Sequence, residues 1–460
     1  MSATRLGPRT WSAFVVLGLA GQLAWTVENM YLNVFVYDTI TDSPQVIAAL
    51  VAASAVVATL TALVVGALSD RTGRRRALVA VGYVLWGAST AAFGLVGPET
   101  VGSIFPGWEA VTAAIVGIIL LDCLMSFFGA AANDAGFQAW VTDSTDSTNR
   151  GRVDGVLGTL PLLAMLLVFG ALDPLTQSGQ WGLFFGLVGG VTAVVGLLAL
   201  VAVRDRTPAV REGGPLADVV YGLRPSTIRK HPRLYQILLV LALAGTASQV
   251  FLPFLIIYIQ RTLRIDAYAL VLGVVLIVAS LLSVLGGRFI DRVGKLRAIL
   301  PAFGIFAVGL VGMVFVRDLV PVIIAGTVMM AGFLISFAAI NATIRDLTPR
   351  DRAGTVQGVR MIASVLVPMV FGPWIGAAVI SGVGETYLDL GVEKQVPTAG
   401  IFVAALVVLA LAVPAVALLL RRMRGATPAE VAAVTAVAPP ESAEDGTGSA
   451  DAEREPVEGR

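Results

Sequence analysis

Three acidic residues lie within long apolar stretches of the sequence. Glu28 is near the middle of the first stretch, Asp122 is near the middle of the fourth, and Asp134 is closer to the end of the fourth. An ionisable side chain inside such a stretch costs about 2.5–3.5 kcal/mol on insertion scales, so each one calls for a reason. A buried carboxyl without a basic partner tends to hold a proton. Neither Glu28 nor Asp122 has a lysine, arginine or histidine at comparable depth in its own stretch, so both are candidates for proton uptake and release.

Each of these acids also has a structural interpretation, which the sequence leaves open. A neutral Glu28 would serve as a hydrogen-bond donor between helices, and Asp122 would pack against the backbone of a neighbouring helix. Asp134 is close enough to the end of its segment to be solvated.

Polar residues accompany the acids at helical spacing. At 100° per residue, Gln22, Asn29 and Asn33 fall within about 20° of one line on a helix, with Trp25 beside it. Asp122, Ser126, Gly129 and Asn133 share a face of the fourth stretch, and we expect the two polar faces to meet in a water-accessible cavity. In the second half of the chain, Gln249 is a further candidate. The expected lining residues are Gln22, Trp25, Asn29, Asn33, Asn133 and Gln249.

The composition is that of a protein with many membrane-spanning helices. Of its 460 residues, 57% are hydrophobic and 14% charged, whereas soluble domains carry about 25% charged residues. A spanning helix needs about 20 mostly apolar residues. This rule predicts an all-α membrane protein with twelve spans, six on each side of a polar stretch. The spans are expected near residues 11–37, 44–68, 77–97, 110–139, 153–172, 181–203, 234–260, 268–290, 298–316, 319–341, 355–380 and 399–420.

Several functional classes are disfavoured by composition. Cys123 is the single cysteine and His231 the single histidine, which argues against disulfides, cysteine metal sites and Ser-His triads. A net charge of +1 argues against a nucleic-acid partner. We therefore expect no enzymatic activity, no catalytic residues, no cofactor and no metal.

A short polar motif between apolar runs occurs twice. Its first copy runs from Gly66 to Arg76 and its second from Gly287 to Lys295, at a constant offset of 221 residues (66 to 287, 70 to 291). In each copy one glycine allows close helix packing, an acid can bridge to a neighbouring helix, and a second glycine permits a sharp turn. A second repeat supports a duplicated chain, because Asp143 precedes Gly155 by twelve residues and Asp346 precedes Gly358 by twelve.

Basic residues predict the orientation of the spans. Arginine and lysine concentrate in the loops on one side, among them residues 71–76, 150–152 and 292–297, whereas the other side has only Arg261, Arg264, Arg317 and Lys394. By the positive-inside rule both termini are expected in the cytoplasm, and the protein in the cell (inner or plasma) membrane with multiple passes.

Four regions are predicted along the chain. Residues 1–203 form an N-terminal six-helix bundle and residues 234–424 a C-terminal one. Residues 204–233 form a cytoplasmic linker, in which Leu216, Val219, Val220 and Leu223 have the spacing of a short amphipathic helix. Residues 425–460 are rich in Ala, Pro, Gly and acids and are expected to be disordered.

The doubled motif resembles the cytoplasmic signature loop of the major facilitator superfamily, found between its second and third and its eighth and ninth helices. The resemblance covers roughly residues 11–424. It implies two pseudo-symmetric six-helix bundles and a cytoplasmic gate that latches the halves in one state. The gate residues it implies are Gly66, Asp70, Arg71, Gly73, Arg74, Asp291, Arg292 and Gly294.

The run from Asn133 to Asp143, continuing to Arg152, resembles the glycoside–pentoside–hexuronide:cation symporter branch, of which melibiose permeases are members. In that branch the acid matching Asp134 belongs to a cation site shared with acids of the second span. This sequence has no acid between Pro44 and Leu68, so a proton is favoured over sodium as the coupling ion.

These observations predict a secondary active transporter that moves a small polar, sugar-like solute by alternating access, through proton-coupled symport. Its expected partners are the solute, the coupling cation and membrane lipid, and it is expected to be a monomer. Two alternatives remain. One is a proton-driven exporter of drugs or other amphiphiles, and the other is a sensor or lipid-binding protein of the same fold without transport.

Overall fold

The computed structural model describes residues 6–146, 149–205, 221–348, 353–389 and 392–424. Within these ranges, twelve helices are long and apolar enough to cross a membrane, and each predicted span overlaps one of them. Their bounds are Pro8–Thr39, Pro44–Ser69, Arg75–Leu95, Ala110–Ser144, Arg150–Gln177, Trp181–Ala202, Pro232–Thr262, Tyr268–Val293, Lys295–Phe315, Leu319–Leu347, Val356–Val383 and Gly400–Met423. The predicted all-helical membrane fold is confirmed.

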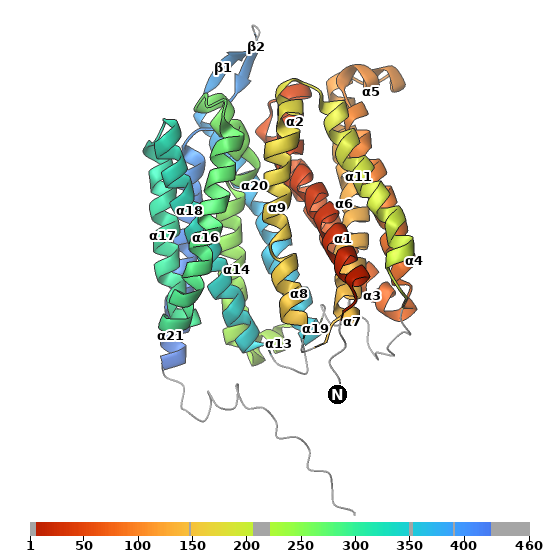
Figure 1. Ribbon diagram of the computed structural model, residues 1–460. Coiled ribbons are helices and arrows are strands. Elements are labelled where there is room, and N and C mark those ends of the chain that lie inside the picture. Colours follow the sequence, from red (N-terminus) through yellow and green to blue (C-terminus); the bar gives the residue numbers. More distant parts are fainter. Residues whose placement is uncertain (1–5, 147–148, 206–220, 349–352, 390–391, 425–460) are drawn as a thin grey trace, which may run out of the picture.

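Several spans of the N-terminal half are composite (Figure 1). Its elements in chain order are α1 (Pro8–Thr26), the π-helical turn η1 (Val27–Tyr31), α2 (Leu32–Thr39), α3 (Pro44–Thr72), α4 (Arg75–Ala92), η2 (Phe93–Leu95), α5 (Pro98–Ile104), α6 (Ala110–Gly129), the π-helical segment η3 (Ala130–Phe137), α7 (Gln138–Ser144), α8 (Arg150–Leu157), α9 (Leu160–Leu167), the π-helical turn η4 (Val168–Leu172), α10 (Asp173–Gln177) and α11 (Trp181–Ala202).

The C-terminal half follows the same plan. Its elements are α13 (Pro225–Lys230), α14 (Pro232–Gln249), η5 (Leu252–Phe254), α15 (Leu255–Ile257), the π-helical turn η6 (Tyr258–Thr262), α16 (Tyr268–Val293), α17 (Lys295–Phe315), α18 (Leu319–Leu347), α19 (Ala353–Met361), the π-helical turn η8 (Ile362–Leu366), α20 (Val367–Val383), the strands β1 (Thr386–Asp389) and β2 (Val392–Gln395), and α21 (Gly400–Arg424). The strands pair antiparallel, with Thr386 opposite Gln395 and Tyr387 opposite Lys394.

Proline and glycine set several helix boundaries. Pro44 and Pro232 are the first residues of their helices, where the missing N–H would have had no partner. Gly73 ends α3 with φ of 66° and Gly294 ends α16 with φ of 94°. Such positive φ values favour glycine, which explains the second glycine of each copy of the doubled motif.

Helices within each half approach closely through glycine. Gly87 on α4 and Gly189 on α11 face each other so closely that a Cβ on either would lie 2.3 Å from the carbonyl oxygen of the other. In the C-terminal half, a Cβ on Gly309 of α17 would lie 2.2 Å from the backbone of Met329 on α18. Small residues at such crossings give van der Waals packing, which holds helices together in a bilayer.

The two halves meet along a few helix pairs. The second span, α3, packs on α20, while α9 and η4 of the fifth span pack on α16 of the eighth. Figure 1 shows β1, β2 and α5 at the end of the helices opposite the N-terminus. We call this the distal end, and the end that holds the N-terminus the proximal end.

Some elements were not predicted, and two predicted segments lie outside the described residues. The sequence analysis missed α5 and the β1–β2 hairpin, because both are too short to leave a periodic pattern of hydrophobic residues. Residues 206–220, which contain Leu216, Val219 and Val220 of the predicted amphipathic helix, and residues 425–460, the predicted disordered tail, lie outside the described residues.

Candidate functional site

A cavity of about 550 Å³ lies between the two halves. Four predicted residues line it: Gln22 and Trp25 on α1, Asn29 in η1, and Gln249 at the end of α14. The Trp25 ring packs against the Trp86 ring, with ring centroids 5.2 Å apart. Residues from both halves thus share one internal space near the middle of the spans.

The backbone around Gln249 is irregular. The helix α14 ends at Gln249, and the chain passes through the 3₁₀ turn η5 before it resumes as α15. Pro253, whose nitrogen carries no hydrogen, lies in this break. Interrupted helices within a membrane are tolerated where they border a cavity or are buried in protein, and Gln249 and Pro253 both line the cavity.

Asn33 does not line the cavity, contrary to the prediction. It is 1% exposed, and its Nδ2 donates a hydrogen bond to the Asn29 carbonyl at 3.1 Å. The prediction assumed 100° per residue along the whole span, but Asn29 lies within the π-helical turn η1, which ends at Tyr31, before Asn33. A π-helical turn contains more residues than an α-helical turn, so it rotates the residues after it away from the line.

Glu28 and Asp122 are brought together, but inside the N-terminal half. Glu28 is 6% exposed and Asp122 is 1% exposed, and neither is among the cavity residues. The Ser126 hydroxyl donates a hydrogen bond to Glu28 Oε1 at 2.6 Å. Ser126 lies on α6, one helical turn after Asp122. The polar faces of the first and fourth spans therefore meet, as predicted, but the contact is buried rather than water-accessible.

Each of these two carboxyls keeps one oxygen without a hydrogen bond. Among the described residues, Glu28 Oε2 and Asp122 Oδ1 are buried and have no partner. Ser54 of α3 lies beside Asp122, and α3 has no acid between Pro44 and Leu68. Buried polar atoms without partners are uncommon in native structures and call for a functional explanation.

Asn133 and Asp134 form a second polar contact in the same half. Asn133 Nδ2 donates to Asp134 Oδ1 at 2.8 Å, and the Tyr83 hydroxyl lies 2.9 Å from Asn133 Oδ1 and 3.0 Å from the Leu17 carbonyl. Asn133 is buried and Asp134 is half-buried, both in η3. Neither lines the cavity.

The structure adds a carboxyl that the sequence analysis missed. Asp173, 1% exposed at the start of α10, accepts hydrogen bonds from the hydroxyls of Tyr31, at 2.8 Å, and Tyr268. Its other oxygen accepts from Gln177 Nε2 at 2.6 Å. The expected fifth span stopped at residue 172, so Asp173 was counted with the following loop. Its position directly after an apolar run was the available signal.

This contact belongs to a set of bonds that join the halves at the distal end. Tyr268 is in the C-terminal half, whereas Asp173 is in the N-terminal half. Further hydrogen bonds between described residues link the halves there: Arg261 to Asp38 at 2.7 Å, the Tyr37 hydroxyl to the Gln395 carbonyl at 2.6 Å, the Gln395 N–H to Asp42 at 2.7 Å, and Gln45 to Ser381 at 2.6 Å.

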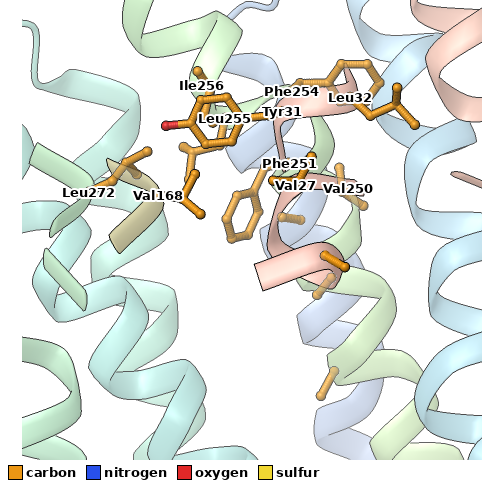
Figure 2. Packing of buried hydrophobic residues seen from close by; sticks show 14 of the residues in the cluster. Val27, Tyr31, Leu32, Val168, Val250, Phe251, Phe254, Leu255, Ile256 and Leu272 are labelled. Atoms are coloured by element: carbon orange, nitrogen blue, oxygen red, sulfur yellow. The ribbon is translucent and has the colours of Figure 1, made fainter. Parts of the chain in front are cut away.

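An apolar layer lies next to these bonds. Figure 2 shows Val27, Tyr31 and Leu32 of the first span and Val168 of the fifth grouped with residues of the seventh and eighth spans. The partners labelled there are Val250, Phe251, Phe254, Leu255, Ile256 and Leu272. These side chains are buried, and Leu255 and Leu272 also line the cavity, so the layer lies between its wall and the bonds of the distal end.

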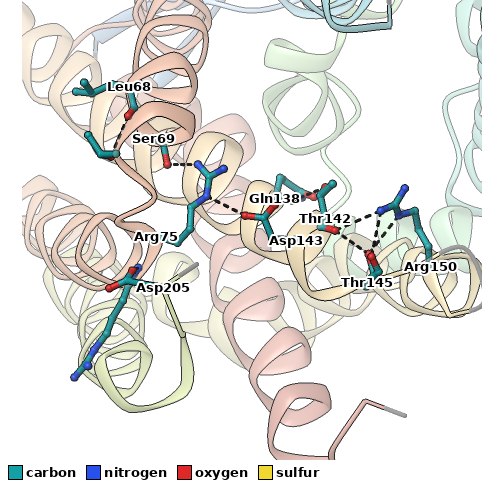
Figure 3. A network of polar contacts seen from close by, with 11 residues as sticks. Leu68, Ser69, Arg75, Gln138, Thr142, Asp143, Thr145, Arg150 and Asp205 are labelled. Atoms are coloured by element: carbon teal, nitrogen blue, oxygen red, sulfur yellow. Dashed lines mark hydrogen bonds and ion pairs between the residues drawn. The ribbon is translucent and has the colours of Figure 1, made fainter. Parts of the chain in front are cut away.

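The doubled motif makes polar contacts within its own half. In the N-terminal half, Arg75 pairs with Asp143, with Nε and Oδ2 3.3 Å apart, and donates to Ser69, as Figure 3 shows. In the C-terminal half, Lys295 pairs with Asp346 at 2.7 Å. In both pairs the acid, Asp143 or Asp346, is the one that belongs to the second sequence repeat.

Among the residues whose side chains the structure describes, the predicted gate residues make no hydrogen bond or ion pair between the halves. Arg71, Arg74, Asp291, Arg292 and Gly294 are exposed, Gly66 is half-buried, Gly73 is buried, and the side chain of Asp70 lies outside what the structure describes. Their role as a gate stays a prediction.

The sequence profile of the Major Facilitator Superfamily matches residues 13–370 and, in an overlapping match, residues 237–447. The chain belongs to the Major Facilitator Superfamily. As a member, it is a multi-pass membrane transporter and not an enzyme, and the expected superfamily fold is confirmed. Among curated proteins, no sequence matches it.

Two solved transporter structures are similar in fold to this chain. A bacterial homologue of the human lysosomal transporter Spinster, inward-facing and unoccupied, is 15% identical with a TM-score of 0.69, over 92% of this chain and 100% of that one. The nucleoside transporter NupG is 12% identical with a TM-score of 0.66, over 91% of this chain and 100% of that one. At these identities the likeness shows the fold alone.

Proposed function

We propose that this transporter couples solute movement to protons, by alternating access to the cavity between its halves. The observation that carries the proposal is the pair of buried acids, Glu28 and Asp122, each with one oxygen that lacks a partner among the described residues. A buried carboxylate in this setting is costly, whereas a protonated carboxyl is neutral. Glu28 directly precedes Asn29, which lines the cavity, so a change at the cavity can reach the acid through the backbone of η1.

Asp173 differs from these acids, which supports a separate role. Its two oxygens accept hydrogen bonds from Tyr31, Tyr268 and Gln177. Both of its oxygens are therefore engaged in hydrogen bonds, unlike the oxygens of Glu28 and Asp122 that lack a partner among the described residues. We therefore assign proton coupling to Glu28 and Asp122 and closure of the distal end to Asp173 and Tyr268.

A proton is preferred to sodium as the coupling ion. The resemblance to the glycoside–pentoside–hexuronide:cation symporter branch would place acids of the second span in a cation site. Here α3 offers the hydroxyl of Ser54 beside Asp122 instead of a carboxyl. Two carboxyls and a hydroxyl suit a proton, which needs one acceptor, better than a metal cation, which needs several oxygen ligands. Asp134, with Asn133, is proposed as an accessory polar site.

The proposed arrangement retains the orientation and organisation expected from the sequence. Both termini are cytoplasmic, the two bundles comprise residues 1–203 and 234–424, and the chain acts as a monomer. The proximal end is then cytoplasmic, and the doubled motif forms the gate that closes there in the opposite state. The substrate is a small organic solute whose polar groups meet Gln22, Asn29 and Gln249. A sugar-like solute is one such class.

A second candidate is the proton-driven export of amphiphiles. The specific observation in its favour is the cavity wall, which combines those amides with methionine, leucine and phenylalanine side chains. Import and export use the same cavity and acids, and they differ in which side binds solute more tightly when the acids are protonated.

The test is transport in proteoliposomes with an imposed pH or sodium gradient and a panel of labelled solutes. The Glu28→Gln variant should lose accumulation driven by the pH gradient and keep exchange of labelled for unlabelled solute. Glu99→Gln, which changes an exposed acid of α5, is the matched control. Full pH-driven accumulation by Glu28→Gln would remove its coupling role, and binding without exchange would favour a sensor.

A further inference from the structure

The charge of the cavity wall is the first clue to its ligand. Among the described residues that line the cavity, none is aspartate, glutamate, lysine, arginine or histidine. An ion that leaves water for such a site loses its hydration and gains no opposite charge, which is strongly unfavourable. The site therefore discriminates against charged ligands.

The second clue is the concentration of methionine. The chain has 10 methionines, and half of them line this one cavity: Met30, Met165, Met313, Met329 and Met330. The first two come from the N-terminal half and the other three from the C-terminal half. Methionine is flexible and polarisable, so a wall rich in it adapts to apolar groups of different shapes.

The third clue is the position of groups able to form hydrogen bonds. Gln22 and Gln249 come from the first and seventh spans and make no side-chain hydrogen bond to any described residue. Asn29 uses its Nδ2 on the Trp25 carbonyl at 2.8 Å, which leaves its oxygen for another donor. Amides both donate and accept, so this side of the cavity matches a neutral hydroxyl or amide.

Resting on the transport function proposed above, we infer that the cavity binds a neutral amphiphile: its polar head meets Gln22, Asn29 and Gln249, and its apolar body lies on the methionine-rich wall. A sugar without an apolar part would leave that wall in contact with water or empty. A drug-like cation or an anionic lipid would lack a counter-charge. The volume of about 550 Å³ is in the range of sites for small organic ligands.

The test uses water-soluble probes that share one body. The full chain in lipid nanodiscs is titrated with 4-phenylbutanamide (neutral head), 4-phenylbutyrate (anionic head), 4-phenylbutylammonium (cationic head), acetamide (a head without the body) and glucose. Binding is followed by calorimetry against empty nanodiscs. We expect 4-phenylbutanamide to bind at least about tenfold more tightly than each of the other four, the factor that corresponds to about 1.4 kcal/mol.

Variants test whether the apolar body of the ligand contacts the methionine-rich wall and whether its polar head contacts the amide side chains. Met330→Thr should weaken 4-phenylbutanamide binding several-fold, whereas Met369→Thr, on α20 and outside the cavity wall, should not. Gln249→Leu should remove the advantage of 4-phenylbutanamide over the other probes. Size-exclusion profiles and thermal unfolding would confirm that each variant is folded.

Several outcomes would overturn the inference. The inference is wrong if a charged probe, glucose or acetamide binds more tightly than 4-phenylbutanamide. It is also wrong if no probe binds at millimolar concentration, or if Met330→Thr and Met369→Thr weaken binding equally. Transport assays separate this result from the proposed function. If 4-phenylbutanamide binds as expected and is not exchanged, the transport proposal fails and the site stands. If glucose alone is bound and transported, the site proposal fails and transport stands.

Discussion

The hydroxyl of Tyr268, on the C-terminal half, donates a hydrogen bond to the same Asp173 oxygen that accepts one from Tyr31 on the N-terminal half. One carboxylate therefore holds one tyrosine within its own half and one across the interface. All three residues are buried, at 1% exposure for Asp173, 2% for Tyr268 and 0% for Tyr31. The Tyr268 bond, which crosses the halves, can therefore be removed by mutation without removing the Tyr31 bond, which lies within one half.

The first prediction is that Tyr268→Phe opens the distal end. An intramolecular hydrogen bond is worth about 0.5–1.5 kcal/mol net, so its loss should shift the equilibrium toward the open state by about two- to tenfold. Spin labels at Thr100→Cys on α5 and Asp318→Cys before α18, in a Cys123→Ser background, would report longer distances between the halves. Both positions are exposed.

Tyr31→Phe is the matched control for that prediction. It removes a hydrogen bond to the same Asp173 oxygen, but this bond lies within one half, so opening between the halves does not require it to break. The distance distribution should stay close to that of the parent chain. Equal opening by the two variants would show that loss of stability, and not release of the interface, causes the change.

The second prediction concerns the coupling acids. Glu28→Gln and Asp122→Asn should each lower the initial rate of pH-driven accumulation, and the double variant should be little worse than either single one. Groups that act as one unit are non-additive, with coupling energies of about 0.5–3 kcal/mol. The readout is a double-mutant cycle on uptake rates. Additive losses would mean that the two acids act independently.

The third prediction concerns the glycine contact between α4 and α11. Gly189→Ala should destabilise the protein by about 1–3 kcal/mol, because its Cβ would lie 2.3 Å from the Gly87 carbonyl oxygen and backbone cannot move aside cheaply. Gly186→Ala, one turn earlier on the same helix, has open space at its Cβ and should be neutral or slightly stabilising. Thermal unfolding in detergent measures both, and equal melting temperatures would contradict the packing argument.

The fourth prediction concerns pH and the start of α6. Hydrogen bonds from Thr112, through its hydroxyl and its N–H, and from the Val111 N–H lower the pKa of the exposed Glu109 below its ordinary value of 4.5. Since the folded pKa is the lower one, the cap stabilises the protein above pH 4.5, and this contribution is lost as pH falls through the folded pKa.

The measurement for this fourth prediction compares melting temperatures of the parent chain and Glu109→Ala. The difference should be largest near neutral pH and should shrink as the pH is lowered below 4.5, because a protonated carboxyl caps the helix less well. The effect is small, as Glu109 is exposed. A difference that grows on acidification would contradict the assigned cap.

The sequence by itself determined the twelve spans, their division into halves and the presence of two acids within apolar spans. These features follow from hydropathy and composition, because a bilayer requires each crossing segment to satisfy its own backbone and to be apolar along its length. The constant offset between the motif copies adds the duplication. None of this depends on how the helices pack.

Only the tertiary structure decided which residues share the cavity and which hold the halves together. Asn33 does not line the cavity because η1 changes the helical register. The position of a π-helical turn depends on hydrogen bonding and packing, which the spacing of residues in the sequence does not encode. Glu28 and Asp122 turned out to be buried with Ser126 instead of facing water. Asp173 gained its role from Tyr268, 95 residues away, because contacts between distant segments exist only once the two halves are assembled.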